Sequence, residues 1–228
     1  MQLVTKDDSA LLYRYIVELY GADQAEKILE KYGGNLWGRD GLAYIIGRVS
    51  LPFFCQYFLQ DTFRPKADNA ARGLAPFHFE VWGALDDMFV KDQFDKLELV
   101  MPRGSSKTTT CDFALTVWAH CYKLSVYTLI CGKTEQDAVE FVRNVRTALE
   151  DNPYINAAFG NLLNPKNKRL VCNSLELELT NGTKVQAISS TSSMRGKKFG
   201  NYRPSLIIAD DYQGKADILT QEARDRKY

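Results

Sequence analysis

Apolar positions recur with two different periods along this chain, and the change in period divides the chain into two parts. Between residues 9 and 32 they recur at helical spacing, on one face before Gly21 and on another face after it, which predicts two short helices. A second apolar segment, residues 44–63, ends at an Arg-Pro pair, and a polar stretch follows it. We therefore expect an N-terminal helical segment over residues 1–70.

From residue 71 onward, strand patterns alternate with helix patterns. Short apolar runs typical of buried strands cover residues 97–101, 125–131 and 206–209, and helical patterns cover residues 77–89, residues 108–122 and a segment that begins at Thr134 with a capping box to Asp137. Residues 175–189 alternate with period two on both sides of an Asn-Gly turn, which predicts a β-hairpin. This order predicts an α/β core over residues 71–228, with a mainly parallel sheet flanked by helices.

Composition adds mainly exclusions. The 228 residues carry a formal net charge of +1, so overall basicity gives no argument for nucleic acid or a membrane as partner. The five cysteines form no CxxC pair, and we expect buried, reduced thiols. No signal peptide is evident at the start, and the least charged stretch, residues 49–60, is too short to span a bilayer. We therefore expect no membrane insertion.

The stretch LELVMPRGSSKTTT, residues 97–110, carries the most informative chemistry. An apolar strand that runs through a small-residue loop into a helix with a lysine and a threonine is the order that a phosphate-binding loop requires. Lys107 would contact phosphate, and Thr108 would reach Mg²⁺. The strict pattern is not met, because Met101 and Ser106 occupy its two glycine positions and Gly104 alone supplies conformational freedom. The alternative is a turn of small residues before an ordinary helix.

A nucleotide site also needs carboxylates at the end of a neighbouring strand, and SLIIADD supplies two. Asp210 is the candidate ligand of Mg²⁺, and Asp211 is the candidate base that orients the attacking water. A strand followed by a solvated acidic turn is the alternative. Because both elements fall at the carboxyl ends of expected strands, together they predict a P-loop NTPase core.

Three strings in this order, PRGSSKTTT, SSMRGKKFG and RPSLIIADD, resemble the ATPase portion of bacteriophage DNA-packaging terminase large subunits. The resemblance covers about residues 70–228. It implies that Lys107 contacts phosphate, that Thr108 and Asp210 hold Mg²⁺, and that Asp211 activates water, although many members have Glu at that last position. Arg103 would be a charge sensor in the same subunit. Arg195 would be an arginine finger toward a neighbouring subunit's nucleotide.

The resemblance also implies cofactors, partners and a location. ATP and Mg²⁺ would be bound, with nucleotide contacts from Gly104, Ser105, Ser106, Lys107, Thr108, Thr109 and His78. His78 lies in PFHFE, where the family places its adenine contact; a buried histidine at a helix start is the competing interpretation. The implied partners are double-stranded DNA, a small terminase subunit and a portal protein, in a homo-oligomeric ring in the cytoplasm of an infected host cell. The family's coupling motif and nuclease domain would lie beyond Tyr228, so no DNA cleavage is expected of this chain.

Two small basic clusters are candidate DNA contacts, although such clusters are more often solvated faces: Lys197 and Lys198 beside Arg195, and Lys166, Lys168 and Arg169. Two other functional classes stay open. One is a different P-loop enzyme, helicase-like or a nucleotide kinase, although no arginine-rich lid typical of a kinase is visible. The other is a non-catalytic interaction or scaffold protein with a degenerate loop and two ordinary surface aspartates.

Overall fold

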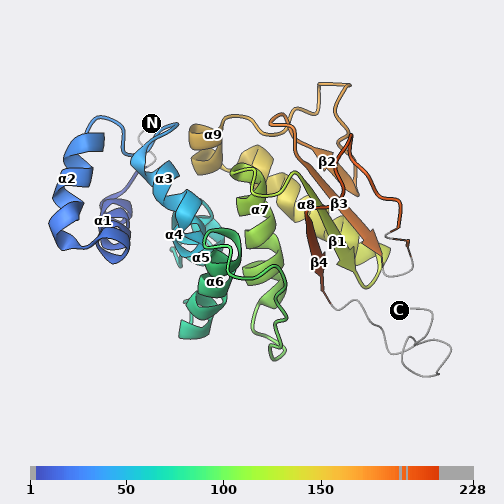
Figure 1. The fold of residues 1–228 in the computed structure, drawn as a ribbon, viewed down its shortest axis with the longest axis horizontal. Helices are drawn as coiled ribbons and strands as arrows, with labels where there is room; N and C mark the ends of the chain where they lie inside the picture. Colours follow the sequence, from blue (N-terminus) through green and yellow to red (C-terminus); the bar gives the residue numbers. More distant parts are fainter. Residues whose placement is uncertain (1–3, 190–191, 194, 211–228) are drawn as a thin grey trace. The chain divides into compact units, whose positions relative to one another are not determined.

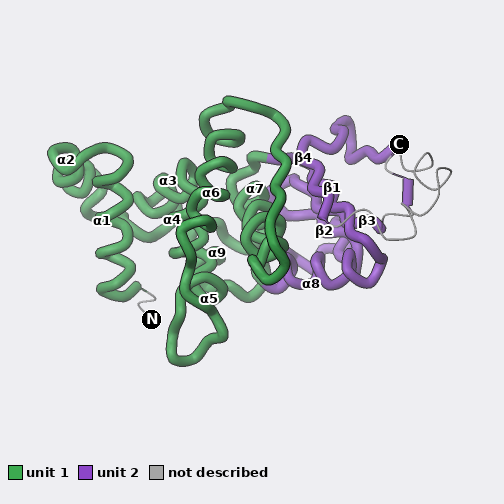
Figure 2. Tube along the Cα trace, turned by 90° about the horizontal axis from the view of Figure 1, so that it is seen from below, with its two compact units in different colours: residues 1–124, 148–162 green, residues 125–147, 163–228 purple. Residues whose placement is uncertain are grey.

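The computed structural model describes residues 4–189, 192–193 and 195–210 of the chain. The chain forms two compact units, one made of Met1–Leu124 with Ala148–Leu162 and the other of Ser125–Thr147 with Leu163–Tyr228 (Figure 2). Residue 70, where the sequence predicts a domain boundary, lies inside the first unit. The N-terminal helices and the expected phosphate loop therefore belong to the same compact unit, and the division at residue 70 stays a prediction.

The first unit is built from helices (Figure 1). These are α1 (Lys6–Tyr20), α2 (Ala22–Tyr32), α3 (Leu42–Val49), α4 (Leu51–Tyr57), α5 (Gln60–Phe63), α6 (Pro76–Phe89), the π-helical turn η1 (Thr108–Phe113), α7 (Ala114–Cys121) and α9 (Pro153–Phe159). The two predicted N-terminal helices are confirmed. They separate at Gly21, whose φ of 84° ends α1, because a glycine reaches this left-handed region without steric cost.

Aromatic side chains fill the core of this unit around α4. Phe53, Phe54 and Phe58 are fully buried, and the ring of Phe58 meets that of Phe159 on α9 at 5.4 Å. Asp86 of α6 accepts a hydrogen bond of 2.8 Å from the backbone N–H of Leu51, at the start of α4. Burial raises the pKa of Asp86 to about 7. These contacts fix α4, α6 and α9 against one another.

Two tryptophans attach α6 and α7 to the rest of the first unit through backbone carbonyls. Trp118 of α7 donates its indole N–H to the carbonyl of Gly47 at 2.7 Å, and Trp82 of α6 donates to that of Thr110 at 2.9 Å. Both rings are fully buried. A buried indole that also satisfies its polar N–H holds two elements in one fixed arrangement. The start of η1 is therefore tied to α6.

The second unit contains a mixed sheet of four strands in the order β2-β3-β1-β4 (Figure 1). The strands are β1 (Tyr127–Gly132), β2 (Glu176–Glu178), β3 (Lys184–Ser189) and β4 (Leu206–Ala209). β1 pairs in parallel with both β3 and β4, whereas β2 and β3 are antiparallel. The sheet is thus mostly parallel, as predicted. Its central strand β1 is buried along nearly its whole length, as a parallel strand covered on both faces must be.

The predicted helix after Thr134 and the predicted hairpin are both confirmed. Helix α8 covers Glu135–Asp151, and the Thr134 N–H and hydroxyl donate to the Asp137 carboxylate at 3.1 and 2.7 Å while the Asp137 N–H returns to the hydroxyl. In both ribbon views the first part of α8 lies alongside the sheet (Figures 1 and 2). The β2–β3 hairpin turns at Gly182, whose φ is 86°. The described fold is therefore an α/β fold with a mostly parallel sheet flanked by helices.

The strand predicted over residues 97–101 is wrong. The segment is not a strand of the described sheet. Leu97, Leu99 and Met101 are half-buried, whereas Glu98 is exposed and Val100 is 91% exposed, so only one side of the segment is covered. A strand inside a parallel sheet is covered on both faces, whereas the side of this segment that carries Glu98 and Val100 is exposed.

The cysteines agree with the prediction of reduced thiols. None of the five, all within the described residues, forms a disulfide; Cys172 is half-buried and the other four are buried. Burial raises the pKa of the Cys131 thiol to about 11, and also raises those of Cys55 and Cys121. The described helices include none that combines the length and the apolar character needed to cross a membrane.

Candidate phosphate loop and acidic strand end

Residues 102–107 form a tight loop directly before η1. The N–H of Ser105 donates to the carbonyl of Pro102 at 3.4 Å, and the chain takes a left-handed conformation twice, at Gly104 with φ 83° and at Ser106 with φ 56°. Loops with alternating left- and right-handed residues direct successive backbone N–H groups toward a common point, where they can bind an anion. No strand precedes the loop in the described structure, and left-handed residues at Gly104 and Ser106 are its distinguishing backbone feature.

Ser105 has an unusual environment within this loop. The residue is only 9% exposed, and its hydroxyl oxygen makes no hydrogen bond within the described part of the chain. A buried hydroxyl without a partner costs about 1–3 kcal/mol, so such groups are uncommon unless a ligand or water satisfies them. The N–H groups of a helix start and an unsatisfied hydroxyl beside them form a donor set suited to phosphate oxygens.

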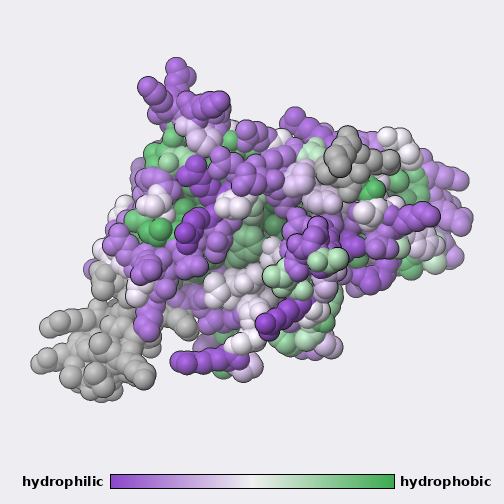
Figure 3. Space-filling view, turned by 180° about the vertical axis from the view of Figure 1, so that it is seen from behind, coloured by the Kyte–Doolittle hydropathy of each residue, from purple (hydrophilic) through white to green (hydrophobic). Residues whose placement is uncertain are grey.

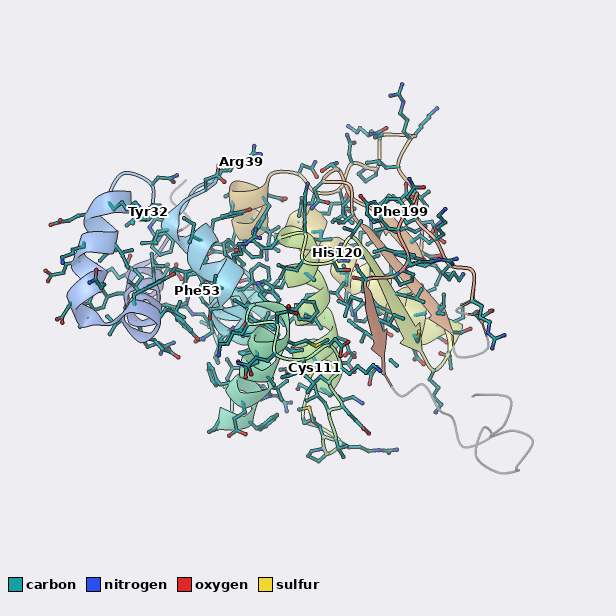
Figure 4. The ribbon with its side chains drawn as sticks, viewed as in Figure 1. Tyr32, Arg39, Phe53, Cys111, His120 and Phe199 are labelled. Carbon is teal, nitrogen blue, oxygen red and sulfur yellow. The ribbon has the colours of Figure 1, made fainter. Side chains whose placement is uncertain are left out.

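The helix after the loop begins with a π-helical turn, in which a backbone carbonyl accepts a hydrogen bond from the N–H group five residues later in the chain. Such turns are rare in proteins, and those that occur are often found at functional sites. They widen the helix and move side chains away from their regular positions. Lys107 precedes the turn and is half-buried, Thr108 is exposed and Thr109 is half-buried. Cys111, also in the turn, is buried (Figure 4). The hydrogen bond from Trp82 to Thr110 holds this turn, and with it the loop, in place.

Ser106 occupies the position of the second glycine in the strict loop pattern, and its left-handed backbone is costly for a residue with a Cβ atom. We expect Ser106→Gly to raise the free energy of unfolding by about 0.5–1 kcal/mol, after allowance for the greater entropy of glycine in the unfolded chain. The measurement is thermal or urea unfolding. Ser174→Gly is the matched control, because Ser174 lies outside the left-handed region and its replacement should give no gain. Equal changes in both variants would contradict strain at Ser106.

His78 lies at the start of α6 and takes part in the cap of that helix. Its Nδ1 accepts the N–H of Ala75 at 2.9 Å. The residue is 9% exposed, and its ring lies against that of Phe77 at 3.9 Å between centroids. The buried histidine at a helix start that the sequence suggests is therefore present. Contact of His78 with an adenine stays a prediction.

Asp210 lies at the carboxyl end of the parallel strands of the second unit. Its N–H donates to the carbonyl of Cys131 at 3.2 Å, which extends the pairing of β4 with β1 by one residue. Gly132 of β1 is in turn paired with Ser189 of β3, so three strand ends meet at this edge. Asp210 is half-buried. This is the position in which open α/β sheets carry ligand-binding residues.

The same edge carries a Gly-Lys-Thr sequence, of which only the helix cap at Thr134 was predicted. Gly132, Lys133 and Thr134 connect β1 to α8, and a Gly-Lys-Thr sequence between a buried strand and a helix could have been identified as a second phosphate-loop candidate. The capping box argues against that role. The Asp137 carboxylate already accepts the N–H and the hydroxyl of Thr134, and its negative charge would repel a phosphate at the same helix start.

The remaining predicted site residues are Arg103, Arg195 and Asp211. Arg103 is exposed in the turn before Ser105, and Arg195 is exposed in a turn with Gly196, whose φ is 79°. Asp211 lies outside the described residues. The loop belongs to the first unit, and Asp210 and Arg195 belong to the second, so a joint site formed by both is a prediction. Within the described chain no three His, Cys, Asp or Glu side chains gather in a group that could hold a metal ion.

Comparison with known proteins adds no relative. No protein-family model matches the chain, and no curated protein or solved structure is significantly similar to it.

Proposed function

We propose that this chain is the ATP-binding part of a DNA-packaging motor of the viral terminase large-subunit type. The observation that carries the proposal is the loop before η1, in which two left-handed residues and the unsatisfied Ser105 hydroxyl precede a helix that begins beside Lys107. Backbone N–H groups, a hydroxyl and an ammonium group in one loop match the oxygens of a di- or triphosphate. The resemblance of the three sequence strings to terminases supports the choice among P-loop proteins.

Each predicted residue has a distinct role in this proposal. Lys107 neutralises charge on the terminal phosphates, while Gly104, Ser105 and Ser106 supply donors from the loop. Thr108 and Asp210 hold Mg²⁺, which supplies positive charge to the phosphate oxygens during phosphoryl transfer. Asp211 accepts a proton from the attacking water. The two remaining residues, Arg103 in the same subunit and Arg195 toward a neighbouring one, stabilise the negative charge of the transition state.

In this proposal one carboxylate and one hydroxyl suffice as the protein ligands of Mg²⁺. Magnesium keeps several waters and takes its other ligands from substrate phosphates, so it needs few protein ligands. The lack of a three-residue metal cluster among the described residues is thus compatible with a site that forms only with nucleotide.

Thermal unfolding of the full chain with and without MgATP tests the proposal. A ligand that binds only the native state at 100 times its Kd stabilises the protein by about 2.7 kcal/mol, which is about 5–10 °C in melting temperature at this size. We expect that increase with MgATP and a smaller one with ATP and EDTA. An unchanged melting temperature with excess MgATP would instead support a non-catalytic interaction protein.

Asp210→Asn should remove the part of the stabilisation that depends on the metal. The amide keeps the size of the side chain but loses the charge that attracts Mg²⁺, so MgATP should stabilise this variant no more than ATP with EDTA does. Asp151→Asn, at an exposed position in α8, is the matched control and should keep the difference between the two conditions. If both variants respond to Mg²⁺ like the original chain, Asp210 is not a ligand.

A further inference from the structure

Basic residues are concentrated in the second unit although the whole chain is nearly neutral. Residues 163–210 contain eight lysines and arginines but only three acids, of which Asp210 lies at the carboxyl end of the sheet. The other two acids are Glu176 and Glu178 on β2. A surface of uniform sign forms only if these two carboxylates do not neutralise the surrounding bases, so their partners decide the character of the surface.

Both carboxylates are engaged inside the hairpin by Lys184. The Nζ of Lys184 lies 3.0 Å from Glu176 and 3.9 Å from Glu178, and its side chain is 10% exposed. Glu178 also accepts the N–H of Val171 at 3.1 Å, and Glu176 accepts the side-chain amide of Gln186 at 2.5 Å. The carboxylates of β2 are therefore paired with Lys184, Gln186 and the backbone of Val171, and not with the exposed bases around the hairpin.

The same lysine anchors a loop that is distant in sequence. Its Nζ lies 5.7 Å from the ring centroid of Phe199 and 5.8 Å from that of Tyr127, close enough for cation–π attraction. Phe199 lies beside the strands at this end of the sheet (Figure 4). Its backbone pairs with Tyr202 in a tight turn, which fixes the residues on either side of that turn.

The two segments that Lys184 connects both carry exposed bases. One segment precedes β2, where Val171 pairs with Glu178 and the two turns before it present Lys166, Lys168 and Arg169. The other surrounds the Phe199–Tyr202 turn and presents half-buried Lys197 with exposed Lys198 and Arg203. We call these six residues the basic edge. None of them forms an ion pair with a carboxylate of the described chain.

The basic edge lies at the end of the sheet opposite Asp210. Lys184 and Tyr127 are the first residues of β3 and β1, whereas Asp210 follows the last residue of β4. Because β1, β3 and β4 are parallel, these two sets are at opposite ends of the strands. In the view from behind, the projection at the upper left, which contains the turns before β2, is strongly hydrophilic (Figure 3).

We propose that the basic edge binds the sugar-phosphate backbone of double-stranded nucleic acid without sequence preference. The physical reason is the density of unpaired positive charge on two loops held by one buried lysine, since duplex DNA carries one negative charge per about 1.7 Å and releases counterions on contact with such a surface. A single-stranded ligand would require aromatic rings for base stacking. In the basic edge the ring of Phe199 already contacts the Lys184 ammonium group. Of the aromatic residues described in its two loops, Tyr202 is the exposed one, at 57%.

An anionic membrane surface fits the basic edge less well. Membrane-surface segments combine bases with large apolar side chains that enter the bilayer. Between residues 163 and 204 the exposed large apolar residues are Val171 and Tyr202, so far as the structure describes this stretch. The proposal rests on the proposed function for its choice of DNA and deepens it by locating the DNA contact. The residues of the basic edge are different from those proposed to bind the nucleotide.

Fluorescence anisotropy of the full chain with a labelled duplex tests the proposal. We expect Lys166→Ala, Lys168→Ala and Arg169→Ala combined to weaken binding to a mixed-sequence duplex of about 30 base pairs by about tenfold or more at ~50 mM salt, and to reduce the slope of log K against log salt by about 2–3. The matched control removes Lys6, Lys27 and Lys31, which are exposed on α1 and α2 of the first unit, and should bind like the original chain.

A second triple variant, Lys197→Ala with Lys198→Ala and Arg203→Ala, should weaken binding similarly if both loops contact one ligand. Equal affinities for two unrelated duplex sequences are also expected. The proposal is overturned if the original chain does not bind the duplex, if the control loses as much affinity as the basic-edge variants, or if the basic edge is needed for single strands or phosphatidylserine vesicles but not for the duplex.

Two further measurements separate this proposal from the proposed function. Melting temperatures of the triple variants without ligand check that they fold, and each should remain stabilised by MgATP, because the basic edge is at the opposite end of the strands from Asp210. Loss of duplex binding with an intact MgATP response supports the basic edge. A chain that binds duplex through this edge but does not respond to MgATP would overturn the nucleotide site and leave the basic edge supported.

Discussion

Replacing Lys107 by alanine is expected to remove half or more of the stabilisation of this chain by MgATP. The ammonium group is the single full positive charge that the sequence places at the end of the phosphate loop, and the backbone N–H groups supply only partial charges. Hydrogen bonds to charged groups contribute about 1.5–3 kcal/mol each, so the loss should weaken binding by about 10- to 100-fold or more. At a concentration of MgATP that raises the melting temperature of the original chain by about 5–10 °C, a variant that binds about tenfold more weakly should keep about half of that increase, and one that binds about 100-fold more weakly should lose nearly all of it.

The matched control for this variant is Lys96→Ala. Lys96 is exposed and lies shortly before the loop, so its removal changes the net charge equally but leaves the loop intact. Isothermal titration calorimetry gives the affinities directly. If Lys107→Ala binds MgATP as tightly as Lys96→Ala, the loop does not hold the phosphates, and the proposed function fails at its central step.

Replacing Trp82 by alanine is expected to have the largest effect on stability. The side chain is fully buried, meets the ring of Phe63 at 5.2 Å and donates to the carbonyl of Thr110. Loss of a buried tryptophan costs about 3–5 kcal/mol, which lowers the melting temperature of a protein of this size by about 6–20 °C. Because Thr110 belongs to η1, the same change should weaken MgATP binding even in the fraction that remains folded.

Two other variants divide this effect into its parts. Trp82→Phe keeps much of the buried ring area but leaves the carbonyl of Thr110 without its donor, so it should cost about 1–3 kcal/mol. Trp37→Ala removes a half-buried indole that meets the ring of Tyr57 on α4 at a tilt, 5.0 Å between centroids, so it should lower stability less and leave MgATP binding unchanged. A fall in nucleotide affinity in Trp37→Ala equal to that in Trp82→Ala would show that the effect is general destabilisation.

Helices and strands with a strong local signal were predictable from the sequence. The capping box at Thr134, the Asn-Gly turn of the hairpin and the period of the apolar residues in α1, α2, α6 and α8 depend on neighbours within a few residues. The helix α9 was not predicted, although its local signal was present: Asn152 caps the helix by accepting N–H groups of Tyr154 and Ile155, and Pro153 follows it.

The candidate site was predictable only in part, for the same reason. Left-handed backbone at Gly104 is what a glycine in a tight loop suggests, and the strand before Asp210 has the bounds that its apolar run predicts. The failure at residues 97–101 shows the limit of this reasoning. An apolar run specifies burial of one face, whereas membership in a sheet depends on a partner strand that is distant in the chain.

The sequence by itself determined most of the helices and strands, the turn chemistry and the residue types that suit a nucleotide, because these follow from contacts between near neighbours. The tertiary structure alone decided that Ser106 is held in a left-handed conformation, that the Ser105 hydroxyl is buried without a partner, and that Lys184 joins two distant basic loops. Burial and long-range pairing depend on which segments pack together, and no window of the sequence contains both members of such a pair.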